Sequence, residues 1–322
     1  MSSVKYFVYK VGQLLLMFWA VLTFLFFLFR SLPGSFADQL IFQGASPDLV
    51  AELETKWGLN EPLYIQYFNF LTNFVQGDAG VSFQYRQPVI EVVQTAFINS
   101  ILLALPPIIL GYLFGVVVGS IMGTNKGSKL EKYGIIPLFV LGTVPSFFLA
   151  ILVVLVFAVW LGWFPTSGLS SAGSASGLDL YLSRDFLWHY TLPFSVIFLR
   201  YTFLPTVLMR TSVVDTMRQD FIFYQRITGI PKLQRMQSVI KHSSIPLITM
   251  FPISMTQAVG GVVLVEFVFG WPGIGIELVN AVNARDYPLV QFTFFIIAAV
   301  VITLNAVVDV LYSVIDPRIE LK

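Results

Sequence analysis

The stretch FINSILLALPPIILGYLFGVVVGSIMG, residues 97–123, lies within a longer run, residues 92–125, that contains no Asp, Glu, Lys or Arg. About 20 predominantly apolar residues are enough for a helix to cross the hydrocarbon core of a bilayer. The rest of the chain has the same character, because 56% of its 322 residues are hydrophobic and 11% are charged. A soluble domain carries about 25% charged residues. The composition therefore predicts an integral membrane protein.

Charge-free windows predict six membrane-spanning helices. The first, residues 11–29, is longer than the apolar region of a secretory signal and is followed by no small-residue cleavage site, so we expect it to be retained. The other five are predicted at about 97–123, 134–161, 187–209, 243–265 and 287–309. The chain then divides into residues 1–30 with the first span, a helical insertion over 31–96, and a five-helix core over 97–322.

The distribution of Lys and Arg predicts the orientation of these helices. With the N-terminus inside, the inner segments hold thirteen basic residues and the outer segments five, and Arg200 falls within a span. Basic residues favour the cytoplasmic side of a membrane. We therefore expect both termini to be cytoplasmic and the insertion 31–96 to be extracytoplasmic.

Two connections are too long to be simple turns. The outer segment shows helical spacing of apolar residues over about 46–57 and again over 63–74, which predicts short amphipathic helices acting as a docking platform or as a lid over helix ends. The inner loop, residues 210–242, is basic, and the sequence Thr-Gly-Ile-Pro at 228–231 divides it. A helix that ends at Gly229 and another that begins after Pro231 would form a helix–turn–helix, facing either anionic lipid or a partner protein.

The sequence shows no recognisable catalytic motif. There is no phosphate-binding Gly-x-x-x-x-Gly-Lys-Ser/Thr loop and no cysteine, and the two histidines, His189 and His242, are predicted at opposite membrane faces. The sequence therefore predicts no enzyme activity and no cofactor or metal bound by this chain.

A series of short motifs carries a resemblance to a known family. The chain resembles the transmembrane permease subunit of ABC importers of the dipeptide/oligopeptide type, the first of two homologous permeases, over nearly its whole length. The matching segments, in order, are Leu32-Pro33-Gly34, Gly58-Leu59-Asn60-Glu61-Pro62-Leu63, Gly77-Asp78-Ala79-Gly80-Val81-Ser82, Trp163-Phe164-Pro165-Thr166-Ser167-Gly168, Glu266-Phe267-Val268-Phe269-Gly270-Trp271-Pro272-Gly273 and Asp316-Pro317-Arg318.

This resemblance implies a fold, a location and a set of partners. The fold is the type I ABC importer permease, in the plasma (inner) membrane of a prokaryote. The partners are a homologous second permease, an extracytoplasmic substrate-binding protein and two ATPase subunits, which bind the ATP and Mg. Nucleic acid is not among them. Relatives of this permease carry dipeptides, oligopeptides, sugars or metal chelates, so the resemblance leaves the cargo open.

The family couples to its ATPases through a Glu-Ala-Ala motif followed, after three residues, by Gly. Here Gly229 fits, but the Glu-Ala-Ala positions hold Phe223, Tyr224 and Gln225. We expect the loop 215–246 to contact the ATPases. The predicted contact residues are Arg226, Gly229, Ile230, Pro231, Lys232 and Arg235.

Arg200 and the segment around Trp271 are the candidate path residues. Arg200 is predicted near the membrane midplane, where it either pairs with Glu266, pairs with a carboxylate of the second permease, snorkels, or lines the path. Glycines 260, 261, 270, 273 and 275 disfavour a regular helix near Trp271-Pro272-Gly273. We expect an outer turn there, acting as a gate or as a plain connection.

Two other functions remain open at this stage. A self-sufficient secondary transporter uses intramembrane ionisable groups and broken helices, and Arg200 and the pair Pro106-Pro107 in the second span are of that kind. A membrane scaffold that transports nothing is the other alternative.

Overall fold

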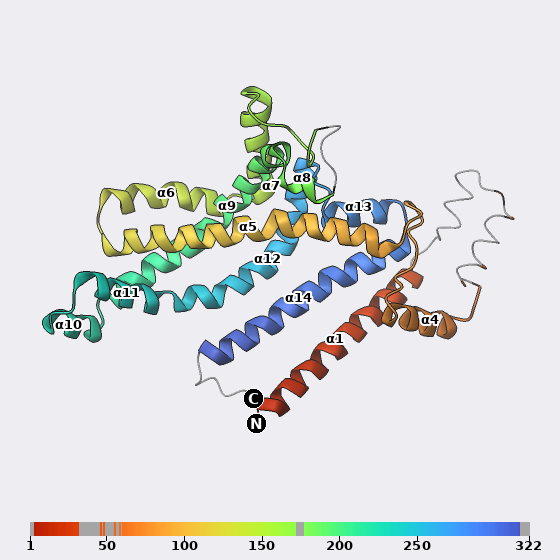
Figure 1. The fold of residues 1–322 in the computed structure, drawn as a ribbon, viewed down its shortest axis with the longest axis horizontal. Helices are drawn as coiled ribbons and strands as arrows, with labels where there is room; N and C mark the ends of the chain where they lie inside the picture. The colour runs from red at the N-terminus through yellow and green to blue at the C-terminus, as the bar shows by residue number, and fades with distance from the viewer. Residues whose placement is uncertain are drawn as a thin grey trace. The chain divides into compact units, whose positions relative to one another are not determined.

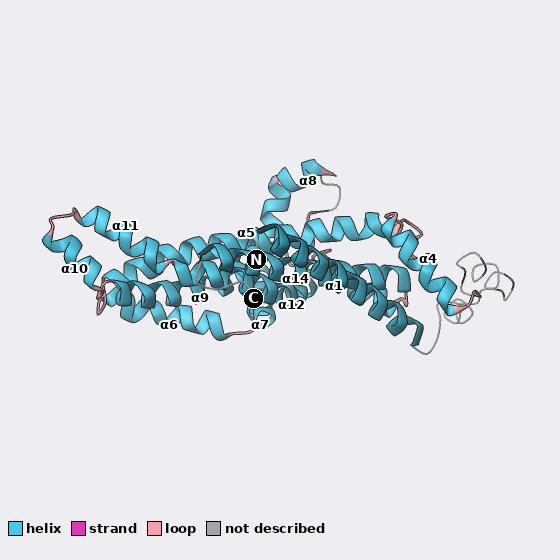
Figure 2. Ribbon diagram, turned by 90° about the horizontal axis from the view of Figure 1, so that it is seen from below, coloured by secondary structure: helices cyan, strands magenta, loops and turns pink. Residues whose placement is uncertain are grey.

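The computed structural model describes residues 3–31, the single positions 46, 48, 55 and 58, residues 60–171 and residues 177–315, with side chains between residues 8 and 307. Regular structure in these parts of the chain is helical, with one isolated β-bridge between Val81 and Pro88 (Figure 2). The predicted all-α fold is therefore confirmed for the described residues. The chain forms two compact units, unit 1 (Met1–Ile98 and Gly273–Thr303) and unit 2 (Asn99–Pro272 and Leu304–Lys322).

The described residues contain five helices that are long and apolar enough to span a bilayer, and a sixth span if a bent helix pair crosses as one. Five are single helices: α1 (Ser3–Ser31, apolar from Val8), α5 (Val89–Thr124), α9 (Arg184–Thr216), α12 (Ile245–Phe269) and α14 (Tyr287–Ile315) (Figure 1). The sixth is a bent pair, α6 (Lys129–Thr143) and α7 (Ser146–Val153), which the π-helix η1 (Val154–Trp160) continues. The two halves of this pair are bent by 105°.

The bend differs from the single helix that we predicted over 134–161. Pro145 explains it, because proline disfavours helical backbone in the residue before it, and Val144 is extended with ψ 132. Two other boundaries also differ. α5 begins at Val89, inside the segment 31–96 assigned to the insertion, and α9 runs to Thr216, beyond the expected end at 209. α4 (Leu63–Val75) is the helix predicted after Pro62, while the helix predicted over 46–57 lies mostly outside the described residues.

The proline pair in α5 does not break the helix, contrary to our expectation for Pro106-Pro107. Proline cannot donate the backbone hydrogen bond to the carbonyl four residues earlier, which for Pro106 is that of Leu102. The hydroxyl of Tyr190 on α9 donates to this Leu102 carbonyl at 2.5 Å instead. A neighbouring helix thus satisfies the group that the proline frees, which is how spanning helices tolerate proline.

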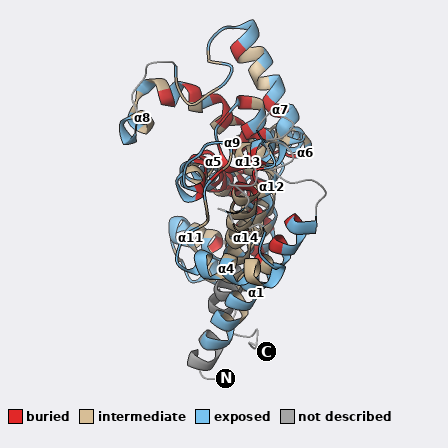
Figure 3. Ribbon diagram, turned by 90° about the vertical axis from the view of Figure 1, so that its right-hand side faces the viewer, coloured by how far each residue is buried: buried red, intermediate tan, exposed pale blue. Residues whose placement is uncertain are grey.

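Unit 1 combines α1, α4, the start of α5, α13 (Ile274–Asn283) and most of α14. The buried side chains of α1 are confined to its C-terminal half, and the rest of the helix is largely exposed (Figure 3).

Asp286, fully buried, accepts hydrogen bonds from Ser82 Oγ at 2.5 Å and from the Gln84 backbone N–H at 3.0 Å. Asp286 thus fixes the loop before α5 to the start of α14. In the same loop, burial and the nearby carboxylates of Glu277 and Asp286 raise the pKa of Tyr85 to about 12.

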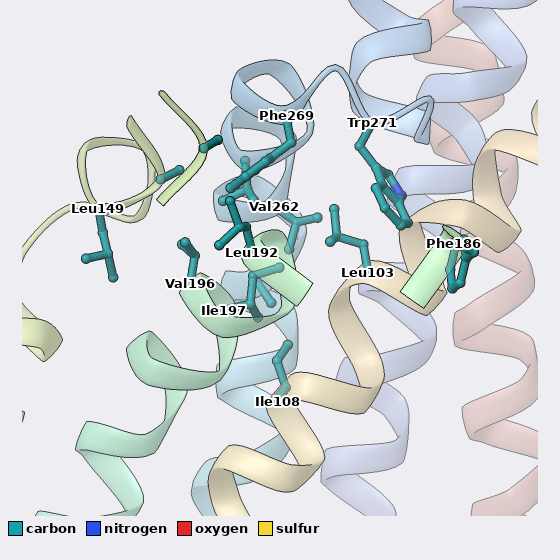
Figure 4. Packing of buried hydrophobic residues seen from close by; sticks show 14 of the residues in the cluster. Leu103, Ile108, Leu149, Phe186, Leu192, Val196, Ile197, Val262, Phe269 and Trp271 are labelled. Carbon is teal, nitrogen blue, oxygen red and sulfur yellow. The ribbon is translucent and has the colours of Figure 1, made fainter. Parts of the chain in front are cut away.

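The core of unit 2 is built from helices that are distant in the sequence. Leu103 and Ile108 on α5, Leu149 on α7, Val196 and Ile197 on α9, and Val262 on α12 meet in one buried cluster that also includes Trp271 (Figure 4).

A row of glycines on α5 allows α9 to approach closely. A Cβ atom at Gly115 would lie 2.8 Å from the Pro205 ring, one at Gly119 would lie 2.5 Å from the Thr206 carbonyl oxygen, and one at Gly123 would lie 2.8 Å from the Arg210 carbonyl oxygen. Small residues four apart are typical of closely packed membrane helices. In unit 2, α5 and α9 therefore contact through their backbones.

Candidate functional site

The loop after α9 folds into two helices joined by a tight corner. α10 (Asp220–Ile227) ends at Thr228, and α11 (Lys232–Ser243) begins after Pro231. Gly229 has φ +79, as the predicted helix end requires. The N–H of Ile230 donates to the Gln225 carbonyl at 3.0 Å and that of Gly229 to the Arg226 carbonyl at 3.3 Å. These two bonds form a Schellman motif, a defined helix C-terminus.

Contacts with α9 and between the two helices hold the corner in place. Ser243 donates to Thr216 on α9 at 3.0 Å, and Val239 is buried in a small core with Met209 and Val213. Gln225 on α10 donates to Ser238 on α11 at 3.3 Å. The corner is therefore a folded element attached to a spanning helix, and it forms one end of unit 2, with α8 (Leu178–Leu182) at the other (Figures 1 and 2).

The corner carries large apolar side chains on its outside. Phe223, Tyr224 and Ile227 on α10 are exposed by 60%, 61% and 61%, and Leu233 on α11 by 73%. Arg226 and Lys232 are exposed beside them, and Ile230 and Arg235 are half-buried. We call Phe223, Tyr224, Arg226, Ile227, Lys232 and Leu233 the corner surface. The predicted contact residues therefore come together at this corner. Our contact set lacked the two aromatic residues, although they stand at the Glu-Ala-Ala positions.

A second polar contact joins α6 to α9 near the corner. The guanidinium of Arg210 donates to the carboxylate of Glu131, with Nε at 2.8 Å from Oε1. The other carboxylate oxygen accepts from the Gly127 N–H, and Ser128 caps the same helix by accepting from the Glu131 N–H at 3.2 Å. The spacing of Ser128 and Glu131 resembles a capping box. That spacing is the sequence signal for the cap, but nothing in the sequence indicates the partner, Arg210.

Arg200 lies at the centre of α9. The helix covers residues 184 to 216, so Arg200 is 16 residues from either end. The central carbon of its guanidinium lies 5.9 Å from the centre of the Tyr201 ring, and Arg200 forms no ion pair among the described residues. Glu266, which we considered as its partner, is buried and accepts a hydrogen bond from Ser100. Arg200 instead lines a cavity.

The segment at 270–273 is an anchored turn. Gly270 ends α12 with φ +55, and Trp271 is fully buried, with its indole N–H donating to the Asn99 carbonyl at 3.0 Å. The Asn99 side chain donates to the Pro272 carbonyl at 2.9 Å and accepts from the Tyr181 hydroxyl at 2.7 Å. Burial raises the pKa of Tyr181, which keeps that donor protonated. No sequence signal pointed to Asn99, which is a lone polar residue in an apolar run.

The glycines around this turn have different roles from those expected. Gly260 and Gly261 lie within α12 and Gly275 within α13, so they do not disrupt regular helix. Gly273 has φ −97 and ψ 177, an extended backbone that any residue adopts. Only Gly270 needs the left-handed conformation that glycine favours.

Among the described residues, no group of three or more His, Cys, Asp or Glu side chains is placed to hold a metal ion. The candidate site in the described residues therefore consists of a helical corner with an apolar surface, a partly buried ion pair and a cation that lines a cavity.

Among the described residues, five apolar helices, a bent apolar pair and an exposed helical corner define a multi-pass helical membrane protein. Comparison with known families gives the same result. Residues 115–321 match the family described as the binding-protein-dependent transport system inner membrane component, and residues 3–104 match the N-terminal region of such components. The chain belongs to this family, whose members are inner-membrane permeases of ABC importers and not enzymes.

Three relatives match over almost their whole length. The oligopeptide transport system permease protein OppB of Haemophilus influenzae is 33% identical, over 93% of this chain and 94% of that protein. The glutathione transport system permease protein GsiC of Salmonella choleraesuis is 32% identical, over 94% of each chain. The di/tripeptide transport system permease protein DppB of Pseudomonas aeruginosa is 30% identical, over 97% of each chain.

Proposed function

We propose that this chain is one of two homologous permease subunits of an ATP-driven importer for short peptides. It forms half of the translocation path, a binding protein delivers the cargo from outside, and two ATPase subunits hold ATP and Mg. The names of the relatives, which refer to oligopeptides, glutathione and di/tripeptides, support this class of cargo. The observation that carries the coupling part of the proposal is the α10–α11 corner.

The chemistry of the corner suits docking to a protein. Phe223, Tyr224 and Ile227 are exposed on a helix that the Schellman motif and the contacts with α9 hold in place. Exposed aromatic residues rimmed by cations are typical of the centres of protein interfaces. In each ATP cycle, the closing ATPases push the corner, and α9 carries the movement into the membrane. The contact residues are Arg226, Gly229, Ile230, Pro231, Lys232 and Arg235, with Phe223 and Tyr224 added.

The same proposal assigns both termini and the corner to the cytoplasmic side. The α5–α6 turn with Lys126 and the start of α6 with Lys129 and Lys132 lie at the same end of unit 2 as the corner (Figure 1). The ion pair between Arg210 and Glu131 joins the two regions. This gathering of basic residues at one end supports the orientation, since positive charges favour the cytoplasmic side.

Crosslinking tests the coupling contact. The chain contains no cysteine, so a single Cys introduced at Ile230, Lys232 or Arg235 is unique. In the assembled complex we expect each of these cysteines to crosslink to an ATPase subunit. A matched control is Leu182→Cys on α8, at the other end of unit 2 and 84% exposed, which should not react with the ATPase. Absence of crosslinks at every corner position would refute the contact.

ATP dependence separates the importer from the two alternatives. A secondary transporter takes up cargo without ATPase subunits, and a scaffold takes up none. The break expected at Pro106-Pro107 is absent because α5 is continuous there, while the α6–α7 pair is bent, so helix breaks alone do not separate these alternatives. Uptake into proteoliposomes with and without ATP measures the difference directly.

A further inference from the structure

Unit 2 contains a cavity of about 450 Å³ at the bend between α6 and α7. Its walls come from the bend itself, from the middle of α9 around Arg200, from Tyr112 on α5 and from α12 between Ser254 and Val265. Small-molecule sites are usually about 300–1,000 Å³. The cavity is therefore large enough for the end of a short peptide.

The cavity has a positive charge that its own walls do not neutralise. Among its sixteen lining residues Arg200 alone carries a formal charge, and no Asp or Glu is present. Arg200 also has no ion pair elsewhere in the described part of the chain. A charge in the middle of a spanning helix is costly unless it is paired or hydrated. The site therefore favours an anion that comes from outside this chain.

The start of α7 adds a second feature that favours an anion. Pro145, Ser146 and Phe147 line the cavity, and they are the N-cap and first two residues of α7. No side chain from the described residues caps this helix end. The N-terminus of a helix carries a partial positive charge and free N–H donors, which bind carboxylates and phosphates. A guanidinium and a helix N-terminus thus face the same cavity.

Hydroxyl groups and one glycine shape the space between these two features. A Cβ atom on Gly261 would lie 3.9 Å from both Ser146 Oγ and Tyr201 Oη. Gly261 therefore lies beside both hydroxyls, and the Ser146 hydroxyl donates to the Gly261 carbonyl at 3.4 Å. Gln257 also lines the cavity, whereas the Tyr112 hydroxyl is already hydrogen-bonded to Ser254.

We propose that this cavity is a carboxylate-recognition site on the translocation path, in which Arg200 and the N-terminus of α7 hold a carboxylate of the cargo. The inference rests on the proposed import function and names the chemical group that the permease itself selects. The carboxylate has two sources in a peptide, its C-terminus and an acidic side chain. Both present the same planar pair of oxygens, which a guanidinium binds through two hydrogen bonds.

Transport by the assembled importer in proteoliposomes tests the proposal with three probes: trialanine, trialanine amide, and Ala-Glu-Ala amide. For each complex, the uptake rate of trialanine, the acid, is divided by that of trialanine amide. This acid-to-amide ratio is compared between the unmodified complex and the Arg200→Gln variant. Because both use the same binding protein, its own preference for acid or amide cancels in the comparison. We expect Arg200→Gln to lower this ratio about tenfold, because the variant loses a charge-assisted hydrogen bond. The Ala-Glu-Ala amide shows whether a side-chain carboxylate substitutes for the C-terminal one.

Two control variants accompany this measurement. Arg184→Gln removes an exposed charge at the start of α9, away from the cavity, and should leave the ratio unchanged. Gly261→Leu fills the space beside Ser146 and Tyr201 without altering charge, and should reduce uptake of all probes while the complex still assembles.

A second measurement does not depend on transport or on removing Arg200. In a Ser146→Cys variant of the assembled complex, the new thiol is the only one in this chain. For each thiol, the rate with the anionic reagent 2-sulfonatoethyl methanethiosulfonate is divided by the rate with the cationic 2-aminoethyl reagent. This ratio should be several-fold higher for Ser146→Cys than for a Leu182→Cys control on the exposed helix α8. Trialanine, but not its amide, should slow the reaction.

The outcomes separate the two proposals. ATP-dependent uptake with an unchanged acid-to-amide ratio in Arg200→Gln overturns the carboxylate site and leaves the importer intact. Absence of ATP-dependent uptake of every probe tells against the peptide-importer function. If Arg200→Gln prevents assembly and removal of a carboxylate on the second permease restores it, Arg200 is a structural partner and the site is refuted. A thiol in the Ser146→Cys variant that shows no preference for the anionic reagent also refutes it.

Discussion

At the scale of single residues, the Tyr190 hydroxyl shows how one side chain allows an unfavourable sequence to form a regular helix. It donates to the Leu102 carbonyl, the group that Pro106 leaves without its helical donor. The ring itself is packed between Phe186 and Phe194, with centroids 5.4 Å from each. The hydroxyl and the ring therefore have separable roles.

We predict that Tyr190→Phe destabilises the protein by about 1–3 kcal/mol, the cost of leaving a buried carbonyl unsatisfied. The ring packing is kept, so the loss reports the hydrogen bond alone. Thermal unfolding of the purified complex measures it. Tyr133→Phe is the control, because Tyr133 is 63% exposed. Equal unfolding midpoints for the two variants would contradict the role given to Tyr190.

A second prediction concerns Gly229. Its φ of +79 is a backbone conformation that β-branched residues rarely adopt, and a Cβ atom there meets no other atom within 4 Å. Gly229→Val should therefore distort the corner through backbone strain, at a cost of about 1–3 kcal/mol, and reduce cargo-stimulated ATP hydrolysis. Gly229→Asn is the matched control, because asparagine tolerates this conformation. ATPase activity of reconstituted complexes distinguishes them, and equal loss in both variants would exclude the strain explanation.

The sequence indicates some of these residues and not others, for a physical reason. The conformation of Gly229 follows from a local pattern, a glycine between a helical segment and a proline. The partners of Glu131 and Leu102 are Arg210 and Tyr190, which are 79 and 88 residues away along the chain. Such pairs depend on how the helices pack, and no local pattern encodes that.

At the scale of helices, the glycine row on α5 fixes how α5 and α9 meet within unit 2. We predict that Gly119→Ala destabilises the pair by about 1–3 kcal/mol, as overpacking does, because its Cβ atom would lie 2.5 Å from the Thr206 carbonyl oxygen. Gly260→Ala is the control, since no atom lies within 4 Å of a Cβ atom there. Unfolding in detergent should distinguish the two, and equal stability would show that α9 moves aside at little cost.

The six spans could be predicted because lipid allows few solutions: every backbone group must be satisfied, so apolar runs become helices. The bend at Val144 was missed although Pro145 marks it, and a break was expected at Pro106-Pro107, where the helix is continuous. Proline alone therefore does not determine where a spanning helix breaks. Whether a spanning helix bends depends on what the neighbouring helices offer its freed backbone groups. The bend itself, from Thr143 to Phe147, forms part of the wall of the cavity beside Arg200.

At the scale of the whole molecule, the proposed orientation gives a direct test. The chain has no cysteine, so the single variants Leu233→Cys in the corner and Leu182→Cys in α8, at positions 73% and 84% exposed, can be labelled selectively. A membrane-impermeant maleimide should label the α8 cysteine in right-side-out vesicles and the corner cysteine only in inverted vesicles. The reverse pattern would place the N-terminus outside. Permeabilised vesicles, in which both should react, control for access.

The guanidinium at the centre of α9 has a further consequence for ion gradients, which follows from its charge. A permease that admits hydrated cargo must not let protons or sodium ions follow it down the membrane potential. The Coulomb repulsion between a fixed unit positive charge and a cation about 5 Å away is roughly 3 kcal/mol at an effective dielectric constant of about 20. Pores use fixed arginines in this way to exclude cations. If the cavity lies on the translocation path as proposed, Arg200 would repel cations whenever water fills it, and we predict that neutralising it raises passive proton flux through the assembled complex.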